Sequence, residues 1–334
     1  MTTPTGSDYR DRKTGLVIFG ILEIAIGAIC GLAILLMLLG QAIASRGSNP
    51  PPGLQVLVPV IALYSLMATA FIWLGIGSIL ARRWARAILL CLSAVALVVG
   101  IISCAFMAFV LPHMFDAVAQ QSRTALQPAA LLMMKVFTAV FMLVFYIIIP
   151  GALFLFYRSP HVKRTCEARD PVERWTDRCP LPVLAISLLL GMGGVFVLGV
   201  VTRFHVLPFF GTFVSGSAGL ALSLVFGGLL LYLACAFYRL QVRAWWIALG
   251  IQVLFAISNA VTFWNADLMD MYLKMGFEHR SAAASAQLLA SPAFRWMTTL
   301  SILPWLIWLL YVRRYFDKPP IPPVLSESEA PTAI

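Results

Sequence analysis

The chain has 334 residues, of which 61% are hydrophobic and only 11% are charged, well below the roughly 25% charged residues of soluble domains. A fold in water could not bury that much apolar surface, so a soluble protein is excluded. On a soluble domain the formal net charge of +10 would suggest that the protein binds nucleic acid. In a membrane protein it suggests contact with anionic lipid head groups at the cytoplasmic face. We therefore expect the lipid bilayer as a partner and no nucleic acid.

Long uncharged runs recur along the sequence, and each can cross a hydrocarbon layer of roughly 30 Å as a helix of about 20 residues. The runs are continuous rather than alternating, which favours helices over a β-barrel. The predicted fold class is therefore all-α, a polytopic integral membrane bundle of about eight transmembrane helices. The expected spans are residues 15–43, 54–80, 87–111 and 129–157, followed by 181–201, 209–237, 244–264 and 293–312.

Residues 158–180 form a long charged run that separates two hydrophobic halves, residues 1–157 and 181–315. Residues 316–334 are proline-rich and then acidic, which predicts a disordered tail. Lys and Arg gather in both terminal segments, in residues 158–180 and in alternate loops, all on one side of an eight-span topology. This asymmetry predicts cytoplasmic termini and localisation to the plasma (inner) membrane.

The charged run carries interleaved basic and acidic residues with a tryptophan among them, which favours a short cytoplasmic linker lying against lipid head groups. His161, Cys166, Asp177 and Cys179 could be read as a zinc site, but their spacing matches no known ligand pattern, so we expect no metal and no cofactor. The arginines expected to contact lipid head groups and orient the chain are Arg82, Arg83, Arg86, Arg164, Arg169 and Arg174.

Two long loops on the opposite side, residues 112–128 and 265–291, look amphipathic. In the second, apolar residues recur at helical spacing with charged residues between them, which predicts segments lying flat at the membrane interface.

The two halves show weak internal similarity. Each has a tight basic turn between its second and third spans and a long loop before its fourth, which suggests two parallel four-helix halves. The alternative is that apolar composition makes any two membrane segments look alike. A shift of 154 residues pairs Asp116 with Asp270, Pro150 with Pro304 and Tyr157 with Tyr311, and after a gap Arg86-Ala87 pairs with Arg243-Ala244.

Glu23 is the one acidic residue well inside a predicted span, where an unpaired charge costs a few kcal/mol. It shares a helix face with Gly20, Gly27 and Gly31, and such glycines let helices approach closely. Glu23 is therefore expected to face protein. It is either a proton or cation site, or a structural carboxyl that is hydrogen-bonded across a helix contact or to Arg82 or Arg83; the structural interpretation is favoured.

Gln252 and Asn259 are seven residues apart in the seventh span, so they lie on one helix face, with Ser258 and Thr262 close by. Together with Glu23 they make up the candidate intramembrane polar site. They could line a polar path, but hydrogen bonds to neighbouring helices are the favoured interpretation.

The sequence has no recognisable catalytic motif, and we expect the protein not to be an enzyme. The leading hypothesis is a structural or accessory membrane component that binds protein or lipid partners. The alternative is a small-solute transporter or channel with a path between the two halves that involves Glu23.

Overall fold

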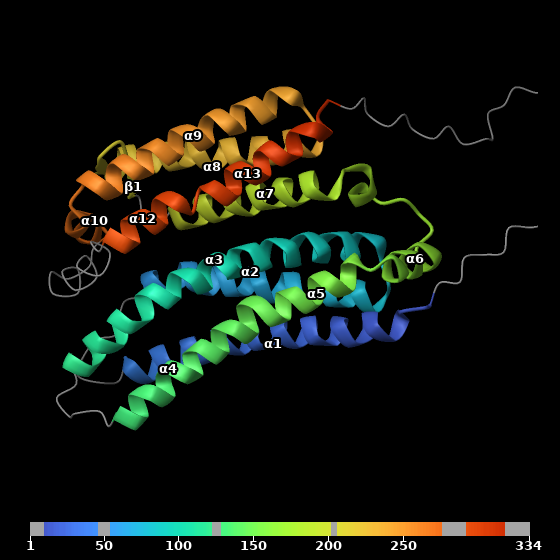
Figure 1. The fold of residues 1–334 in the computed structure, drawn as a ribbon, viewed down its shortest axis with the longest axis horizontal. Helices are drawn as coiled ribbons and strands as arrows, with labels where there is room; N and C mark the ends of the chain where they lie inside the picture. The colour runs from blue at the N-terminus through green and yellow to red at the C-terminus, as the bar shows by residue number, and fades with distance from the viewer. Residues whose placement is uncertain (1–9, 46–53, 122–127, 202–205, 276–291, 318–334) are drawn as a thin grey trace, which may run out of the picture.

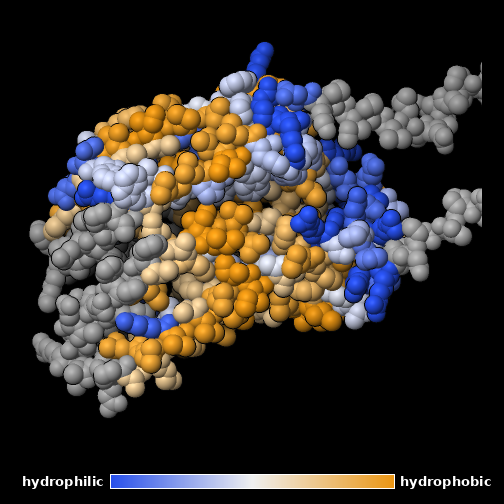
Figure 2. Space-filling model, viewed as in Figure 1, coloured by the Kyte–Doolittle hydropathy of each residue, from blue (hydrophilic) through white to orange (hydrophobic). Residues whose placement is uncertain are grey.

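A computed structural model describes residues 10–45, 54–121, 128–201, 206–275 and 292–317. Within these ranges, eight helical segments are long and apolar enough to cross a membrane, which confirms the prediction of an all-α, multi-pass bundle. Figure 1 shows these helices side by side, with the first helix beginning and the last helix finishing at the same end of the molecule. In Figure 2 hydrophilic residues gather at that end, and hydrophobic residues cover the flank beside them.

The first half contains α1 (Lys13–Ala44), α2 (Leu54–Ile79), α3 (Arg83–Gln121) and a compound fourth span. This span consists of α4 (Pro128–Leu143), the π-helix η1 (Val144–Ile148) and α5 (Ile149–Arg158). The wide η1 turn lies directly before Pro150, which has no N–H to continue a regular helix.

Helix α3 corrects one expectation. Residues 112–121 do not lie flat at the interface, because α3 continues through Pro112 to Gln121. Neighbouring turns of a membrane helix can satisfy the carbonyl that a proline leaves free, so such prolines are tolerated.

The linker contains α6 (Pro160–Arg169) and the 3₁₀ turn η2 (Trp175–Arg178). The second half contains α7 (Leu181–Val201), α8 (Gly216–Tyr238), α9 (Val242–Asn265), α10 (Leu268–Lys274), α12 (Pro292–Leu300), α13 (Leu303–Val312) and η3 (Arg313–Tyr315). The eighth span, expected as one helix over 293–312, is interrupted between α12 and α13, where Pro304 occupies the first turn of the new helix.

The sixth span, predicted at 209–237, starts later than expected because a β-hairpin precedes α8. Strand β1 (Leu207–Phe209) pairs antiparallel with β2 (Thr212–Val214). Positive φ angles at Phe210 (41°) and Gly211 (92°) meet the requirement of a type I′ turn, whose twist matches that of the strands. The hairpin was not predicted because residues 206–237 form one uncharged run that reads as a single span.

The hairpin is held by the neighbouring helices. Ser258 Oγ and Thr262 Oγ1 of α9 accept hydrogen bonds from the backbone N–H groups of Phe210 and Gly211, at 3.1 and 2.9 Å. Leu268 of α10 is buried with the hairpin's Phe213. The two hydroxyls therefore secure the hairpin, and α10 packs on protein.

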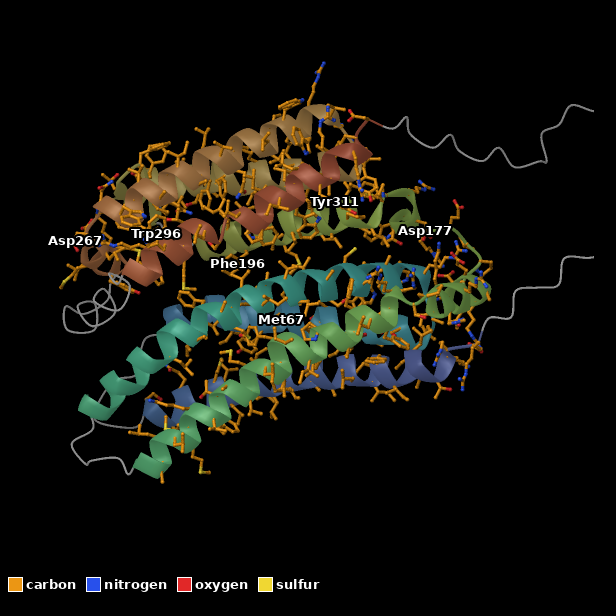
Figure 3. The ribbon with its side chains drawn as sticks, in the orientation of Figure 1. Met67, Asp177, Phe196, Asp267, Trp296 and Tyr311 are labelled. Atoms are coloured by element: carbon orange, nitrogen blue, oxygen red, sulfur yellow. The ribbon has the colours of Figure 1, made fainter. Side chains whose placement is uncertain are left out.

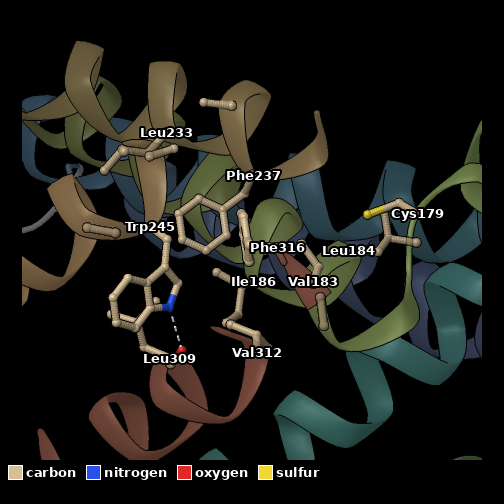
Figure 4. Packing of buried hydrophobic residues seen from close by; sticks show 14 of the residues in the cluster. Cys179, Val183, Leu184, Ile186, Leu233, Phe237, Trp245, Leu309, Val312 and Phe316 are labelled. Carbon is tan, nitrogen blue, oxygen red and sulfur yellow. Dashed lines mark hydrogen bonds between the residues drawn. The ribbon is translucent and has the colours of Figure 1, made fainter. Parts of the chain in front are cut away.

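Helix α3 contributes to the two larger hydrophobic cores. One core lies within the first half, where Ile88 and Leu89 of α3 are buried with Leu16, Leu74 and Tyr157. The other joins Ala87, Cys91 and Val95 of α3 to residues of α7, α8, α9 and α13. Figure 4 shows the second core, in which Trp245 donates a hydrogen bond of 2.8 Å to the Leu309 carbonyl.

The turns after α2 and α8 have the same backbone geometry. Ala81 and Leu240 adopt left-handed φ angles of 52° and 53°. In each turn this residue donates to the carbonyl three residues back and the next residue to the carbonyl five back, the pattern of a Schellman cap. This correspondence pairs Ala81 with Leu240, an offset of 159 residues rather than the 157 that pairs Arg86 with Arg243.

The fourth spans also correspond. Helices α5 and α13 have ten residues each and start 154 residues apart, with Pro150 and Pro304 both in the first turn. Their buried faces differ, however, because Tyr157 is fully buried whereas Tyr311 is 48% exposed. The two tyrosines therefore have different surroundings, and the division into parallel halves stays a prediction.

Candidate functional site

Glu23 lies at the contact of α1, α2 and α5 and is fully buried. The Tyr157 hydroxyl is 2.9 Å from Glu23 Oε1 and 2.6 Å from Ser78 Oγ. Ser78 in turn donates to the carbonyl of Leu16 at 3.0 Å. The prediction that Glu23 faces protein is confirmed, and its neighbours are a tyrosine and a serine rather than Arg82 or Arg83.

Glycines set the spacing around this carboxyl. A Cβ on Gly75 of α2 would lie 2.6 Å from the Gly20 carbonyl oxygen, and one on Gly27 would lie 2.9 Å from that of Ala68. Side chains at these positions would push α1 and α2 apart. The expected contact at Gly31 is absent, because nothing lies within 4 Å of a Cβ built there.

Three consecutive oxygen–oxygen contacts link Glu23 to the Leu16 carbonyl, through Tyr157 and Ser78. The two hydroxyls supply one proton each. Tyr157 donates to Glu23 Oε1 and Ser78 donates to the Leu16 carbonyl, which leaves no proton for the 2.6 Å contact between Tyr157 and Ser78. A proton on the carboxyl supplies the third, with Glu23 then donating to Tyr157 and Tyr157 to Ser78. With an ionised carboxyl, one of the three contacts would have no proton, so the geometry favours neutral Glu23.

The other carboxyl oxygen, Oε2, is buried and has no hydrogen-bond partner. Leaving a charged oxygen without a donor costs more than leaving a neutral one. This arrangement therefore also suits a protonated side chain, and it provides no set of oxygen ligands for a cation.

Gln252 and Asn259 lie elsewhere, at a cavity of about 360 Å³ between α3 of the first half and, in the second half, α9, α13 and the break that precedes α13. They share this cavity with Ser103 and Trp305. Within the described part of the chain, neither amide bonds to a neighbouring helix. The predicted polar site is thus divided between two places, Glu23 in the first half and the two amides where the halves meet.

In the linker, Asp170 is 2% exposed and collects three contacts. Arg174 donates to it at 3.0 Å, Arg82 lies 3.7 Å away, and the Arg83 backbone N–H donates to it at 3.3 Å. The last contact places a negative charge at the N-terminus of α3, where the helix dipole favours it. Asp170 therefore connects the linker to the helix that joins both cores.

The other arginines that were expected to contact lipid head groups have varied surroundings. Arg83 lies 3.8 Å from Asp177, and Arg169 lies 3.0 Å from Asp11. Arg86 is half-buried, and its Nε has no hydrogen-bond partner. Figure 3 places Asp177 at this end of the molecule and Asp267 at the opposite end. The lipid contacts expected of Arg82, Arg83, Arg86, Arg164, Arg169 and Arg174 stay a prediction, and four of the six have acidic protein partners.

The electrostatic balance at Asp170 favours its charge. Burial alone would raise the pKa of this carboxyl, but the hydrogen bond and charge of Arg174, the Arg83 amide and the charge of Arg82 together lower it below its usual value. The side chain is therefore ionised at neutral pH and acts as a fixed anchor for the arginines around it.

The two linker cysteines are expected to be unreactive in the folded protein. Burial raises the pKa of Cys166 to about 11 and that of Cys179 to about 12, so neither is a thiolate at neutral pH. Mass mapping after maleimide treatment should find both modified only once the protein is unfolded. Lys163→Cys, on the exposed side of α6, should label rapidly; equal labelling of native Cys166 would contradict the packing of α6.

Sequence reasoning missed the partners of the key acids. Tyr157 entered only as a repeat position, and Ser78 and Asp170 were not singled out. The one sequence signal that could have indicated Ser78 is that it is a small polar residue within an apolar span. In the described residues, no group of three His, Cys, Asp or Glu side chains could hold a metal.

Comparisons with known proteins found no matching family model, no matching curated protein and no matching solved structure.

Proposed function

We propose that the protein is a non-enzymatic accessory component of the membrane that binds protein or lipid partners. The observation that carries this proposal is the enclosure of Glu23, which is fully buried and hydrogen-bonded to Tyr157. A carrier that uses this carboxyl would have to expose it alternately to the two aqueous sides. Its surroundings instead suit a bond that fastens α1 to α5.

A second candidate is transport of a small solute between the halves. It is favoured by the cavity between α3 and α9. Glu23 lies on α1, which does not line this cavity, so coupling through Glu23 would need a rearrangement of the first half.

Glu23→Gln distinguishes the two functions. The glutamine amide can donate to Tyr157 as a protonated carboxyl would, so thermal unfolding in detergent should change by less than about 1 kcal/mol. Glu23→Ala leaves a cavity and should cost about 2–3 kcal/mol. In liposomes loaded with a pH-sensitive dye, wild type and Glu23→Gln should show the same proton leak; a solute-driven proton flux present only in wild type would overturn the accessory function.

Partner binding is tested by crosslinking in intact membranes. A photoreactive residue at Phe141, whose ring is exposed on α4 between Phe137 and Phe145, should be compared with one at Leu36 on α1. A discrete protein adduct supports an accessory role that uses protein partners. Adducts to bulk phospholipid alone at both positions, with a protein that purifies alone, would count against it.

We also propose that the protein resides in the plasma (inner) membrane with its termini and linker in the cytoplasm. The arginine-rich turns and linker support this orientation. Trypsin added to sealed, right-side-out vesicles should leave the linker intact, and cleavage there from outside would reverse the orientation.

A further inference from the structure

The cavity between the halves contains polar groups whose bonding capacity is unused. Gln252 and Asn259 each offer two N–H donors and a carbonyl acceptor, and Ser103 of α3 adds a hydroxyl. Within the described residues, none of these three side chains makes a hydrogen bond. Amides that face a membrane interior without partners are costly, so a molecule that supplies donors and acceptors would be stabilised here.

The depth of the cavity within the bundle follows from the positions of its lining residues along their helices. At 1.5 Å per residue, Gln252 lies about 15 Å along α9 from its start and Asn259 about 26 Å. Ser103 lies about 30 Å along α3. Both helices start at the end of the molecule that carries the linker, so the cavity extends from about the middle of the bundle toward the opposite end.

The lining also defines the chemistry of the ligand. None of the described residues that line the cavity carries a charge, and Phe255, Ile302 and Trp305 supply apolar surface beside the amides. An ionic group would enter without a counter-charge, at a high desolvation cost. A volume of about 360 Å³ falls in the range of roughly 300–1,000 Å³ typical of small-molecule sites.

We propose that this cavity binds an uncharged molecule whose hydroxyl or amide groups bond to Gln252 and Asn259 and whose apolar part packs against Phe255 and Trp305. Two sources have this chemistry, a neutral lipid and a dissolved neutral solute. This inference rests on the lipid-binding part of the proposed function and requires neither a protein partner nor transport, so failure of the crosslinking test or of the proton-flux test leaves it standing.

The test uses the full-length protein in phosphatidylcholine nanodiscs and native mass spectrometry. The lipid probe is dioleoylglycerol, which carries a free hydroxyl and two ester groups. Its bound fraction should fall roughly tenfold in the double variant Gln252→Leu/Asn259→Leu, which removes two hydrogen-bonding side chains. Gln241→Leu removes an amide outside the cavity, at the turn before α9, and should bind as wild type does.

Two further probes distinguish the alternatives. Dioleoyl phosphatidic acid has the same chains and a charged head group, and it should bind weakly and equally to all variants. Glycerol presents the hydroxyl groups without the chains. If wild type binds glycerol but not dioleoylglycerol, and the double variant binds neither, the ligand has the proposed chemistry but is a dissolved solute rather than a lipid.

Equal dioleoylglycerol binding by wild type and the double variant, together with equal glycerol binding by both, would overturn the proposal, since the amides would then hold only water. Phosphatidic acid binding that depends on the amides would overturn the uncharged class. If the double variant unfolds, Ser103→Val replaces it, because this change keeps both amides and nearly the same volume. A roughly threefold loss is expected from one hydroxyl, and no loss would again contradict the proposal.

Discussion

Replacing Gly100 by alanine is expected to destabilise the protein by roughly 3 kcal/mol or more. A Cβ at this position in α3 would overlap the carbonyl oxygen of Tyr146 in η1. The obstacle is backbone, which cannot rotate away as a side chain can. The Tyr146 carbonyl lies four residues before Pro150, which has no N–H to bind it. This carbonyl packs directly against the backbone of Gly100. Thermal and SDS-induced unfolding in one detergent measure the loss.

Gly250→Ala is the matched control. Nothing lies within 4 Å of a Cβ built at Gly250, which is also in a membrane helix. Alanine there should be neutral or should stabilise by up to about 1 kcal/mol, because alanine favours the helix. If the two variants unfold alike, α3 and the fourth span do not approach each other as closely as the structure shows.

Asp170→Asn is expected to lower stability by about 2 kcal/mol. Breaking a buried ion pair costs roughly 3–5 kcal/mol, and this range is reduced here because Arg82 and Arg174 are about 40% exposed. Asparagine also weakens the negative charge at the start of α3. Glu167→Gln removes the exposed pair with Lys163 and should cost no more than about 0.5 kcal/mol. A similar loss in both variants would mean that Asp170 does not anchor the linker.

The pH dependence follows from the lowered pKa of Asp170. In the unfolded chain this carboxyl takes up a proton at a higher pH than in the folded protein. Its contribution is therefore complete above the unfolded pKa, near 3.8, and is lost as the pH falls through the lower folded value. The difference in melting temperature between wild type and Asp170→Asn should begin to narrow as the pH is lowered from 7 to 3; an unchanged difference at pH 3 would contradict this.

The sequence located the membrane spans because length and apolar continuity alone decide whether a helix can cross a bilayer. It did not reveal the hairpin at Phe210, because an apolar strand and an apolar helix look alike over so few residues. The extension of α3 past Pro112 was also missed, since proline ends helices in water more strictly than in membranes.

The candidate site could be predicted only in part. Glu23 stands out because an acid in an apolar run is conspicuous. Its partner Tyr157 lies 134 residues away and has no local signature. The shared face of Gln252 and Asn259 follows from helical periodicity. The cavity could not be predicted, because it depends on how α3 packs against α9 and α13, and no local sequence pattern determines that packing.

The double role of α3 has a consequence for synthesis of the chain. The first half enters the membrane before α7 exists, and by then α3 already presents the surface around Ala87, Cys91 and Val95 that later joins the second core. Until α7 arrives, lipid chains or an insertion factor must cover that surface. Because α3 is synthesised before α7, we expect the second half to assemble against this face of α3.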